Sequence, residues 1–546
     1  MAKSKSSAKK TSSKKTSSKK SASKRVVGSD IPELRGKSGK GKEFEPTQES
    51  LEALNASLPE LKEPRPYTSR YPIPDAQFER LKAAARKAKI PKGAATIAKD
   101  RGKKEEVAAA AVTELAPAGG PVAAAPLPST NFAGFSATGW IPPDCTMATG
   151  PSHVMLSVNS SVAVYNKTGG APVLVRTLTV WFSNVISGVT IFDPKLLFDQ
   201  HTGRYVLLAV AVSQNPKKSA YLLSVSATTN PLGSWRNYSL NAMVDGSTLT
   251  NNWADFPALG VDPNNLYITS NQFAFGGGFQ YAKIRVVPKA GPYSGGAATF
   301  VDFVNMKNPN GSTAFTIQPC HTFGAPQVEY LVNSLFPSGN SLTVWRLTQS
   351  GSSFSLTKAS VATAAYSLPP NAPQKGNNAP LNTGDVRVLH AVFRGGSLWC
   401  ALTTTHNWVA AASQASIHWF QIQAATPSLV QQGIYGAASL SYFYPACCPD
   451  ANGNMIMVFS RCGTNEFGSI FYTGRKATDP LGSLQASALL KAGVANYVAL
   501  DGGGRNRWGD YNGVCADPSN PKVIWFYSEF AAAVNTWGTW VGSSFF

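Results

Sequence analysis

The sequence has little charge, no long apolar run and few cysteines. Charged residues make up 15% of the 546 residues, against about 25% in a typical soluble domain. The longest purely apolar run covers residues 205–212, which is far shorter than the roughly 20 residues of a membrane-spanning helix. No long stretch beyond the N-terminal region is rich in Ala, Glu, Lys and Leu. We therefore expect no transmembrane segment, and a helical bundle or coiled coil is disfavoured.

The seven cysteines are odd in number and show no Cys-x-x-Cys spacing. They predict neither a disulfide framework nor a zinc site. We expect most of them to be small, buried, apolar side chains.

Positive charge is concentrated at the N-terminus. The net charge is +20, and the first 25 residues hold ten Lys or Arg and no acid. This composition predicts a disordered basic tail over residues 1–42. We expect the tail to bind a polyanion, either nucleic acid or an acidic surface polymer, through counterion release, with a solubilising tether as the alternative. The residues assigned to this role are Lys9, Lys10, Lys14, Lys15, Lys19, Lys20, Lys24 and Arg25.

Three further segments follow the tail. Residues 43–107 predict a weakly helical stem of two helices, one after Pro46 and one opening at Asp75, which docks on the body or on a partner, or stays a solvated stem. The apolar positions of these two helices are Leu51, Leu54, Leu58 and Leu61, then Phe78, Leu81 and Ala85. Residues 108–129 are mostly Ala, Pro and Gly and predict a linker. The first forty residues lack the apolar run of a secretory signal, so the localisation is left open.

Residues 130–546 contain a degenerate repeat of β-rich runs and tight polar turns. The predicted turns fall near residues 150, 199, 262, 325, 394, 450 and 517. Each interval is long enough for the four short strands of a propeller blade. The pattern predicts an all-β fold, a β-propeller with seven blades, or six as the alternative. A solenoid is the competing architecture.

Four segments of this body carry a resemblance. They are Trp140-Ile-Pro-Pro-Asp, Asp255-Phe-Pro-Ala-Leu-Gly-Val-Asp, Tyr472-Thr-Gly-Arg-Lys-Ala-Thr-Asp-Pro-Leu-Gly and Arg507-Trp-Gly-Asp-Tyr-Asn-Gly-Val. Over residues 130–546 the chain resembles bacterial, mostly exported, sialidase-like β-propeller proteins of largely unassigned activity. The chain departs from that pattern where Cys145, Thr146 and Met147 follow Pro-Pro-Asp. The resemblance implies a propeller and an extracellular location, and it brings no catalytic residue.

Five aspartates each precede a predicted turn by six to nine residues. They are Asp144, Asp193, Asp255, Asp385 and Asp510. Because the innermost strand of each blade lines the central channel, these carboxylates are expected to gather at one mouth, with Arg507, Trp508 and Tyr511 beside them. One interpretation is a Ca²⁺ site, with Asp255 and Asp510 as ligands. The alternative is that each carboxylate caps backbone N–H groups of its own or a neighbouring blade.

Two function classes remain open. A sialidase-like glycoside hydrolase needs an arginine cluster, a tyrosine nucleophile and an acid, and the available residues are Arg387, Arg461, Arg505, Arg507, Tyr511 and Glu529. The usual sialidase boxes are missing, so the balance is against an enzyme. We favour a non-catalytic recognition or scaffold propeller that binds a glycan or protein partner, with exposed aromatic side chains stacking on the ligand. The tryptophans considered for this role are Trp235, Trp253, Trp408, Trp508 and Trp537, and for each of them the alternative is core packing between blades. A nucleic-acid-associated structural protein, bound through the tail, is a further alternative.

Overall fold

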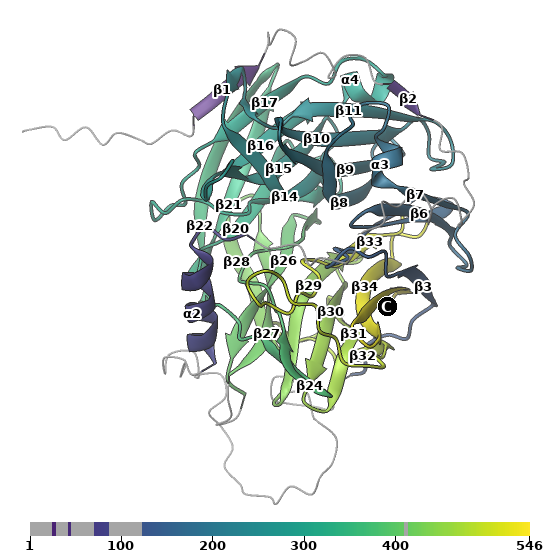
Figure 1. The fold of residues 1–546 in the computed structure, drawn as a ribbon, viewed down its shortest axis with the longest axis vertical. Helices are drawn as coiled ribbons and strands as arrows, with labels where there is room; N and C mark the ends of the chain where they lie inside the picture. The colour runs from purple at the N-terminus through teal and green to yellow at the C-terminus, as the bar shows by residue number, and fades with distance from the viewer. Residues whose placement is uncertain (1–23, 29–41, 45–69, 87–122, 409–412) are drawn as a thin grey trace, which may run out of the picture.

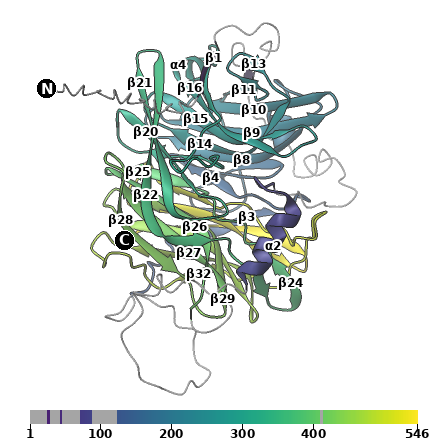
Figure 2. The ribbon, with the colours of Figure 1, turned by 90° about the vertical axis from the view of Figure 1, so that its left-hand side faces the viewer.

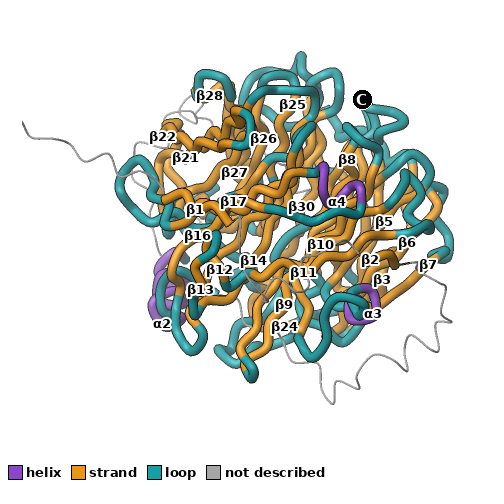
Figure 3. Tube along the Cα trace, turned by 90° about the horizontal axis from the view of Figure 1, so that it is seen from above, coloured by secondary structure: helices purple, strands orange, loops and turns teal. Residues whose placement is uncertain are grey.

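The computed structural model describes residues 24–28, 42–44, 70–86, 123–408 and 413–546. The first predicted helix of the stem, most of the basic tail and most of the linker lie outside these residues. Within them the regular structure is almost entirely β, as Figure 3 shows. The predicted all-β class is confirmed, and the sheets form a β-propeller.

Five separate sheets have four or five strands each. The first holds β4 (Thr146–Thr149), β5 (His153–Val158), β6 (Ser161–Asn166) and β7 (Leu174–Thr177). The second holds β8 (Thr190–Asp199), β9 (Arg204–Gln214), β10 (Lys217–Ser226), β11 (Trp235–Asn241) and β2 (Lys42–Phe44). The third holds β18 (Gln318–Pro319), β20 (Val328–Ser334), β21 (Ser338–Ser350) and β22 (Ser353–Ser367).

The fourth and fifth separate sheets come from the C-terminal part of the chain. The fourth holds β29 (Leu440–Pro449), β30 (Met455–Gly463), β31 (Glu466–Arg475) and β32 (Ala488–Lys491). The fifth holds β33 (Gly513–Ala516), β34 (Ile524–Ala533), β35 (Thr536–Ser544) and β3 (Thr130–Ser136). Because β3 pairs with β35, the two ends of the body are joined in one sheet. Such a shared sheet closes a ring of blades without leaving an open sheet edge.

A sixth sheet has ten strands. It holds β14 (Asn252–Val261), β15 (Asn265–Ala274), β16 (Phe279–Pro288), β17 (Phe300–Val304), β1 (Lys24–Gly28), β19 (His321–Thr322), β25 (Ala391–Arg394), β26 (Ser397–His406), β27 (Gln414–Gln423) and β28 (Ser428–Tyr435). The antiparallel runs β14–β17 and β25–β28 are joined by β19, which bridges in parallel to Val261 and Val392 through His321. The sequence predicts seven or six separate sheets of similar size, and the structure differs because this short strand merges two of the runs.

The remaining elements are two ribbons and three helices. They are β12 (Val244–Asp245) with β13 (Thr248–Leu249), β23 (Ala372–Gln374) with β24 (Asn377–Leu381), α2 (Asp75–Ala85), α3 (Leu178–Trp181) and α4 (Ala290–Ser294). Among the described helices, none combines the length and apolar character needed to cross a membrane.

The predicted turns match the strand order closely. Each lies directly after an inner strand, namely β4, β8, β14, β19, β25, β29 and β33. The sheets from the first half of the body lie in the upper part of Figure 1, and those from the second half lie in the lower part. Apolar side chains of neighbouring sheets fill the space between them, for example Phe192 with Trp253, whose ring centroids are 6.4 Å apart.

The N-terminal region contributes two edge strands and one helix. Residues 24–28 fall within the predicted disordered tail, but they form β1 and pair antiparallel with β17. An edge strand offers a row of unpaired backbone groups, and the Val26-Val27 pair suits a strand. The second predicted helix is confirmed as α2, which begins at Asp75. Figures 1 and 2 show α2 lying against the outside of the sheets.

Candidate functional site

The inner strands carry bulges at equivalent places. Asp144, Asp193 and Phe256 have positive φ angles of 54°, 50° and 51°. The register shifts between Phe192 and Lys195 in β8, and again just after Asp255 in β14. A bulge removes a residue from the strand ladder and leaves its backbone N–H in need of another acceptor.

Side chains from neighbouring sheets supply those acceptors. The Asp510 amide donates to Asp144 Oδ1 at 2.8 Å, and the Phe256 amide donates to Asp193 Oδ2 at 3.2 Å. Asn159 accepts from the Asp193 amide at 2.8 Å and donates to Asp144 Oδ2 at 2.6 Å. The two aspartates therefore hold adjacent inner strands together, as the capping interpretation predicts.

Arginines neutralise two further acids at the same mouth. Asp385 accepts hydrogen bonds from the Arg387 side chain, at 3.0 Å from Nε and 2.7 Å from a terminal nitrogen, and from the Arg387 amide at 2.8 Å. Asp510 pairs with Arg507 at 2.9 Å. All four side chains are largely buried, so each charge depends on its partner.

Burial sets the protonation of the remaining acids. It raises the pKa of Asp144 to about 7 and that of Asp255 to about 6, and the Asp510 charge contributes to both increases. Burial, with the charges of Asp144 and Asp255, raises the pKa of Asp193 well above its usual range. The structure thus brings Asp144, Asp193, Asp255 and Asp510 close enough to influence one another.

The described part of the chain contains no group of three or more His, Cys, Asp or Glu side chains arranged to hold a metal ion. The carboxylates of Asp144 and Asp193 already accept hydrogen bonds, and Asp510 is paired. The calcium interpretation of Asp255 and Asp510 therefore stays a prediction without geometric support.

The tryptophans expected at the surface are mostly core residues. Trp235, Trp253, Trp508 and Trp537 are buried, and Trp408 is partly buried. The Trp508 indole donates to Ser460 Oγ at 3.1 Å. The prediction that these side chains stack on a ligand at the surface is wrong for the four buried tryptophans, because their rings fill the space between sheets.

Tyr511 is also buried, but it faces the channel axis. Its hydroxyl donates to the Pro194 carbonyl at 2.9 Å. The Lys195 ammonium lies 2.8 Å from the centroid of the Tyr511 ring. Lys195 was not among the predicted site residues, because the bulge that places it beside Asp193 leaves no simple sequence signal.

The structure covers the mouth with the segment before and within α2. Tyr71 and Phe78 are buried and stack on each other with ring centroids 3.5 Å apart. The guanidinium carbons of Arg387 and Arg505 lie 5.7 Å and 5.4 Å from the Tyr71 ring centroid. Arg507 also acts electrostatically on Tyr71. Three arginines therefore converge beneath one ring of the N-terminal segment.

Lys82 fixes the other end of α2. Its ammonium donates to Thr383 Oγ1 at 2.8 Å and to the Gly384 carbonyl at 2.7 Å. Burial lowers the pKa of Lys82 to about 7. Lys82 therefore lies on the buried face of α2 with Phe78 and Ala85.

Two small cavities lie at this axis. One of about 10 Å³ is lined by Tyr71, Phe256, Asp385, Arg387 and Asp510, among others. The other, of about 40 Å³, is lined by residues of the inner strands. Since a water molecule needs roughly 10–15 Å³ in this measure, they hold about one and about three waters.

Two members of the hydrolase set have other roles. Arg461 pairs with Glu466 at 2.8 Å and lies over the Phe471 ring. Glu529 is buried and accepts from the Gly509 amide, and burial raises its pKa well above its usual range. Of the predicted arginines, only three therefore meet at the mouth.

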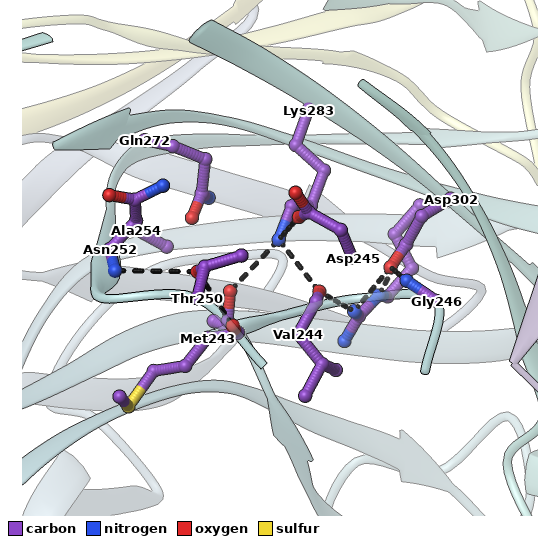
Figure 4. A network of polar contacts seen from close by, with 12 residues as sticks. Met243, Val244, Asp245, Gly246, Thr250, Asn252, Ala254, Gln272, Lys283 and Asp302 are labelled. Atoms are coloured by element: carbon purple, nitrogen blue, oxygen red, sulfur yellow. Dashed lines mark hydrogen bonds and ion pairs between the residues drawn. The ribbon is translucent and has the colours of Figure 1, made fainter. Parts of the chain in front are cut away.

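A second buried charge network lies between β16, β17 and the β12–β13 ribbon (Figure 4). Lys283 lies 2.7 Å from Asp245 and donates to the Val244 carbonyl at 2.8 Å. Arg285 makes two bonds to Asp302, of 2.8 Å and 2.7 Å. Both cations are fully buried. Because these contacts hold the β12–β13 ribbon against the sheet, we assign the network a role in stabilising the fold.

Comparisons with known proteins give the fold and no family. No family model matches the sequence. No curated protein matches it. Solved structures with distant similarity include a Penicillium chrysogenum α-L-arabinanase complexed with arabinobiose, with 10% identity over 77% of this chain and 99% of that one, at a TM-score of 0.34.

Two further structures illustrate how mixed these neighbours are. Trypanosoma rangeli sialidase, in complex with the inhibitor DANA, has 10% identity over 75% of this chain and 60% of that one, at a TM-score of 0.33. The WD40 domain of SCAP from fission yeast has 11% identity over 73% and 84% of the two chains, at a TM-score of 0.31. These structures include two enzymes and a WD40 domain, and they assign no family to this chain.

Proposed function

We propose that this chain is a non-catalytic recognition or scaffold β-propeller that binds a glycan or protein partner. One observation carries the proposal, namely that Tyr71 and α2 cover the axial mouth over cavities of about 10 and 40 Å³. No sugar ring fits such spaces. Among the polar groups that a hydrolase would need there, Arg387 and Arg507 pair with Asp385 and Asp510, and the Tyr511 hydroxyl donates to a backbone carbonyl.

A glycan array probed with the full chain tests the binding function. We expect saturable binding to a defined glycan class, or to a protein partner recovered from the same screen at matched salt. Fluorogenic glycosides incubated with the same preparation test the enzyme. Hydrolysis above the rate without protein would overturn the proposal.

A sialidase-like hydrolase is the second candidate, because Arg387, Arg505 and Arg507 converge beneath Tyr71. An arginine cluster suits a carboxylate-bearing substrate. This function requires the segment 70–86 to leave the mouth.

We also propose that the basic tail binds polyanions. The support is compositional, since residues 1–23 lie outside the described part of the chain, and the first 25 residues hold ten Lys or Arg and no acid. A nucleic-acid-associated structural role is the alternative that this tail would serve.

We infer, finally, that the ten-stranded sheet serves as two blades. The runs β14–β17 and β25–β28 each repeat the four-strand antiparallel order of the separate sheets. Added to the five separate sheets, they give seven blades. An experimental structure tests this count.

A further inference from the structure

Lys195 differs from the other buried cations of the axis. Within the described part of the chain, its ammonium has no hydrogen bond within 3.5 Å and no ion pair within 4.0 Å. Its neighbours are the Tyr511 and Phe256 rings, whose centroids lie 2.8 Å and 5.6 Å away. Lys283, by contrast, is bound by two carbonyls and a carboxylate. The close contacts of the Lys195 amine are therefore with ring faces, and the charges of Asp193, Asp144 and Asp510 act on it from beyond ion-pair distance.

The Lys195 side chain is also partly exposed, and it lines the 40 Å³ cavity. Gln318, His321 and His390 line the same cavity. The Gln318 side-chain oxygen is buried and has no hydrogen-bond partner in the described structure. A small polar molecule that enters this space thus meets both a free amine and an unused acceptor.

Burial favours the neutral form of Lys195, whereas most of the charges that act on it favour the ammonium. Burial lowers the pKa of Lys195 to about 7, against the charges of Asp193, Asp144 and Asp510, which raise it, while Arg387 lowers it. His390 also acts on this amine electrostatically, and burial keeps the pKa of that imidazole at about 4.

We propose that Lys195 is a covalent modification site for small carbonyl compounds, in a cavity that admits molecules of two or three heavy atoms. The neutral Nζ adds to the carbonyl carbon, and the electron pair of the C=O bond moves to oxygen, which takes a proton. Loss of water then gives an imine. No oxidant or reductant is needed for this step.

Reductive methylation of the full chain tests the site, with formaldehyde as the probe and cyanoborohydride as the hydride donor that traps the imine. At pH 7 about half of the Lys195 amines would be neutral, against about 0.04% for a lysine of ordinary pKa. Peptide mass spectrometry should show Lys195 modified at least about 10-fold faster than Lys167, which pairs with Asp517 at 2.8 Å. The site-resolved readout separates Lys195 from the reactive α-amino group.

Three comparisons make the result decisive. The Lys195 rate should level off above pH 7, and Tyr511→Phe, which keeps the ring, should preserve it. Lys283 should stay unmodified. Labelling of Lys195 no faster than Lys167, or as slow as Lys283, overturns the proposal.

Discussion

Replacing Asp144 by asparagine separates the two effects of its carboxylate. In Asp144→Asn the remaining side-chain oxygen still accepts a hydrogen bond from the Asp510 amide. The new NH₂ group, however, faces the side-chain nitrogen of Asn159, which in the wild-type protein donates to Asp144. Losing that bond costs about 1–3 kcal/mol. The same change removes a buried acid whose pKa is raised to about 7.

The second effect depends on pH. A carboxyl with a raised folded-state pKa contributes stability below its unfolded pKa of about 3.9, and this stability is lost as the pH rises through the folded value. Between pH 5 and the folded-state pKa of about 7, the free energy of unfolding of the wild-type protein therefore falls by about 3 kcal/mol, at 1.36 kcal/mol per pH unit. The variant has no such carboxyl, so its free energy of unfolding does not fall in this way by pH 8.5. Asp144→Asn should be destabilising at pH 5 and close to neutral at pH 8.5.

Thermal unfolding at the two pH values measures this difference. For a body of this size about 1 kcal/mol corresponds to about 1 °C in Tm, so the gap between variant and wild type should shrink by about 3 °C at pH 8.5. Asp385→Asn is the matched control, because it leaves Arg387 without its partner's charge and should lower Tm at both pH values. An Asp144→Asn gap that is the same at both pH values would refute the reasoning.

Three further outcomes follow from the contacts described above. Phe78→Ala should release α2, since truncating a buried Phe costs about 3–5 kcal/mol, and limited trypsin digestion should then cut this helix faster. The exposed Gln77→Ala, which keeps every tryptic site, is the control and should leave the packing intact. Deleting residues 1–25 should abolish salt-sensitive binding to polyphosphate, and retained binding by the shortened chain would contradict the tail assignment. Asp302→Asn should lower Tm by several degrees, because it leaves the guanidinium of Arg285 buried without the charge of its partner, and an unchanged Tm would show that the network is not structural.

Much of the body follows from local sequence. The turn at Asp199 to Arg204, and its equivalents, contain the polar residues that a hairpin needs, so the strand order was predictable. The gathering of Asp144, Asp193, Asp255 and Asp510 follows from their equivalent places before those turns.

Other features depend on contacts that no local pattern encodes. Positive φ angles at Asp144 and Asp193, the latter within a bulge of β8, turn these carboxylates toward backbone amides of neighbouring sheets. Tyr71 contacts Arg387, which is more than 300 residues away in the sequence. The sequence therefore predicts an amphipathic helix in this region, but not that the helix and Tyr71 cover the mouth. Trp508 was considered as a surface residue that stacks on a ligand, but it is buried. The sequence alone does not distinguish a tryptophan that contacts a ligand from one that packs between sheets.

The most direct test of the account compares glycoside turnover by the wild-type protein and the Phe78→Ala variant. If the axial acids and arginines are structural, neither protein should release fluorophore from sialosides or other glycosides, even when trypsin shows that α2 has left the mouth. Turnover that appears on release of α2 and disappears with Arg505→Ala would show instead that the mouth is a covered active site.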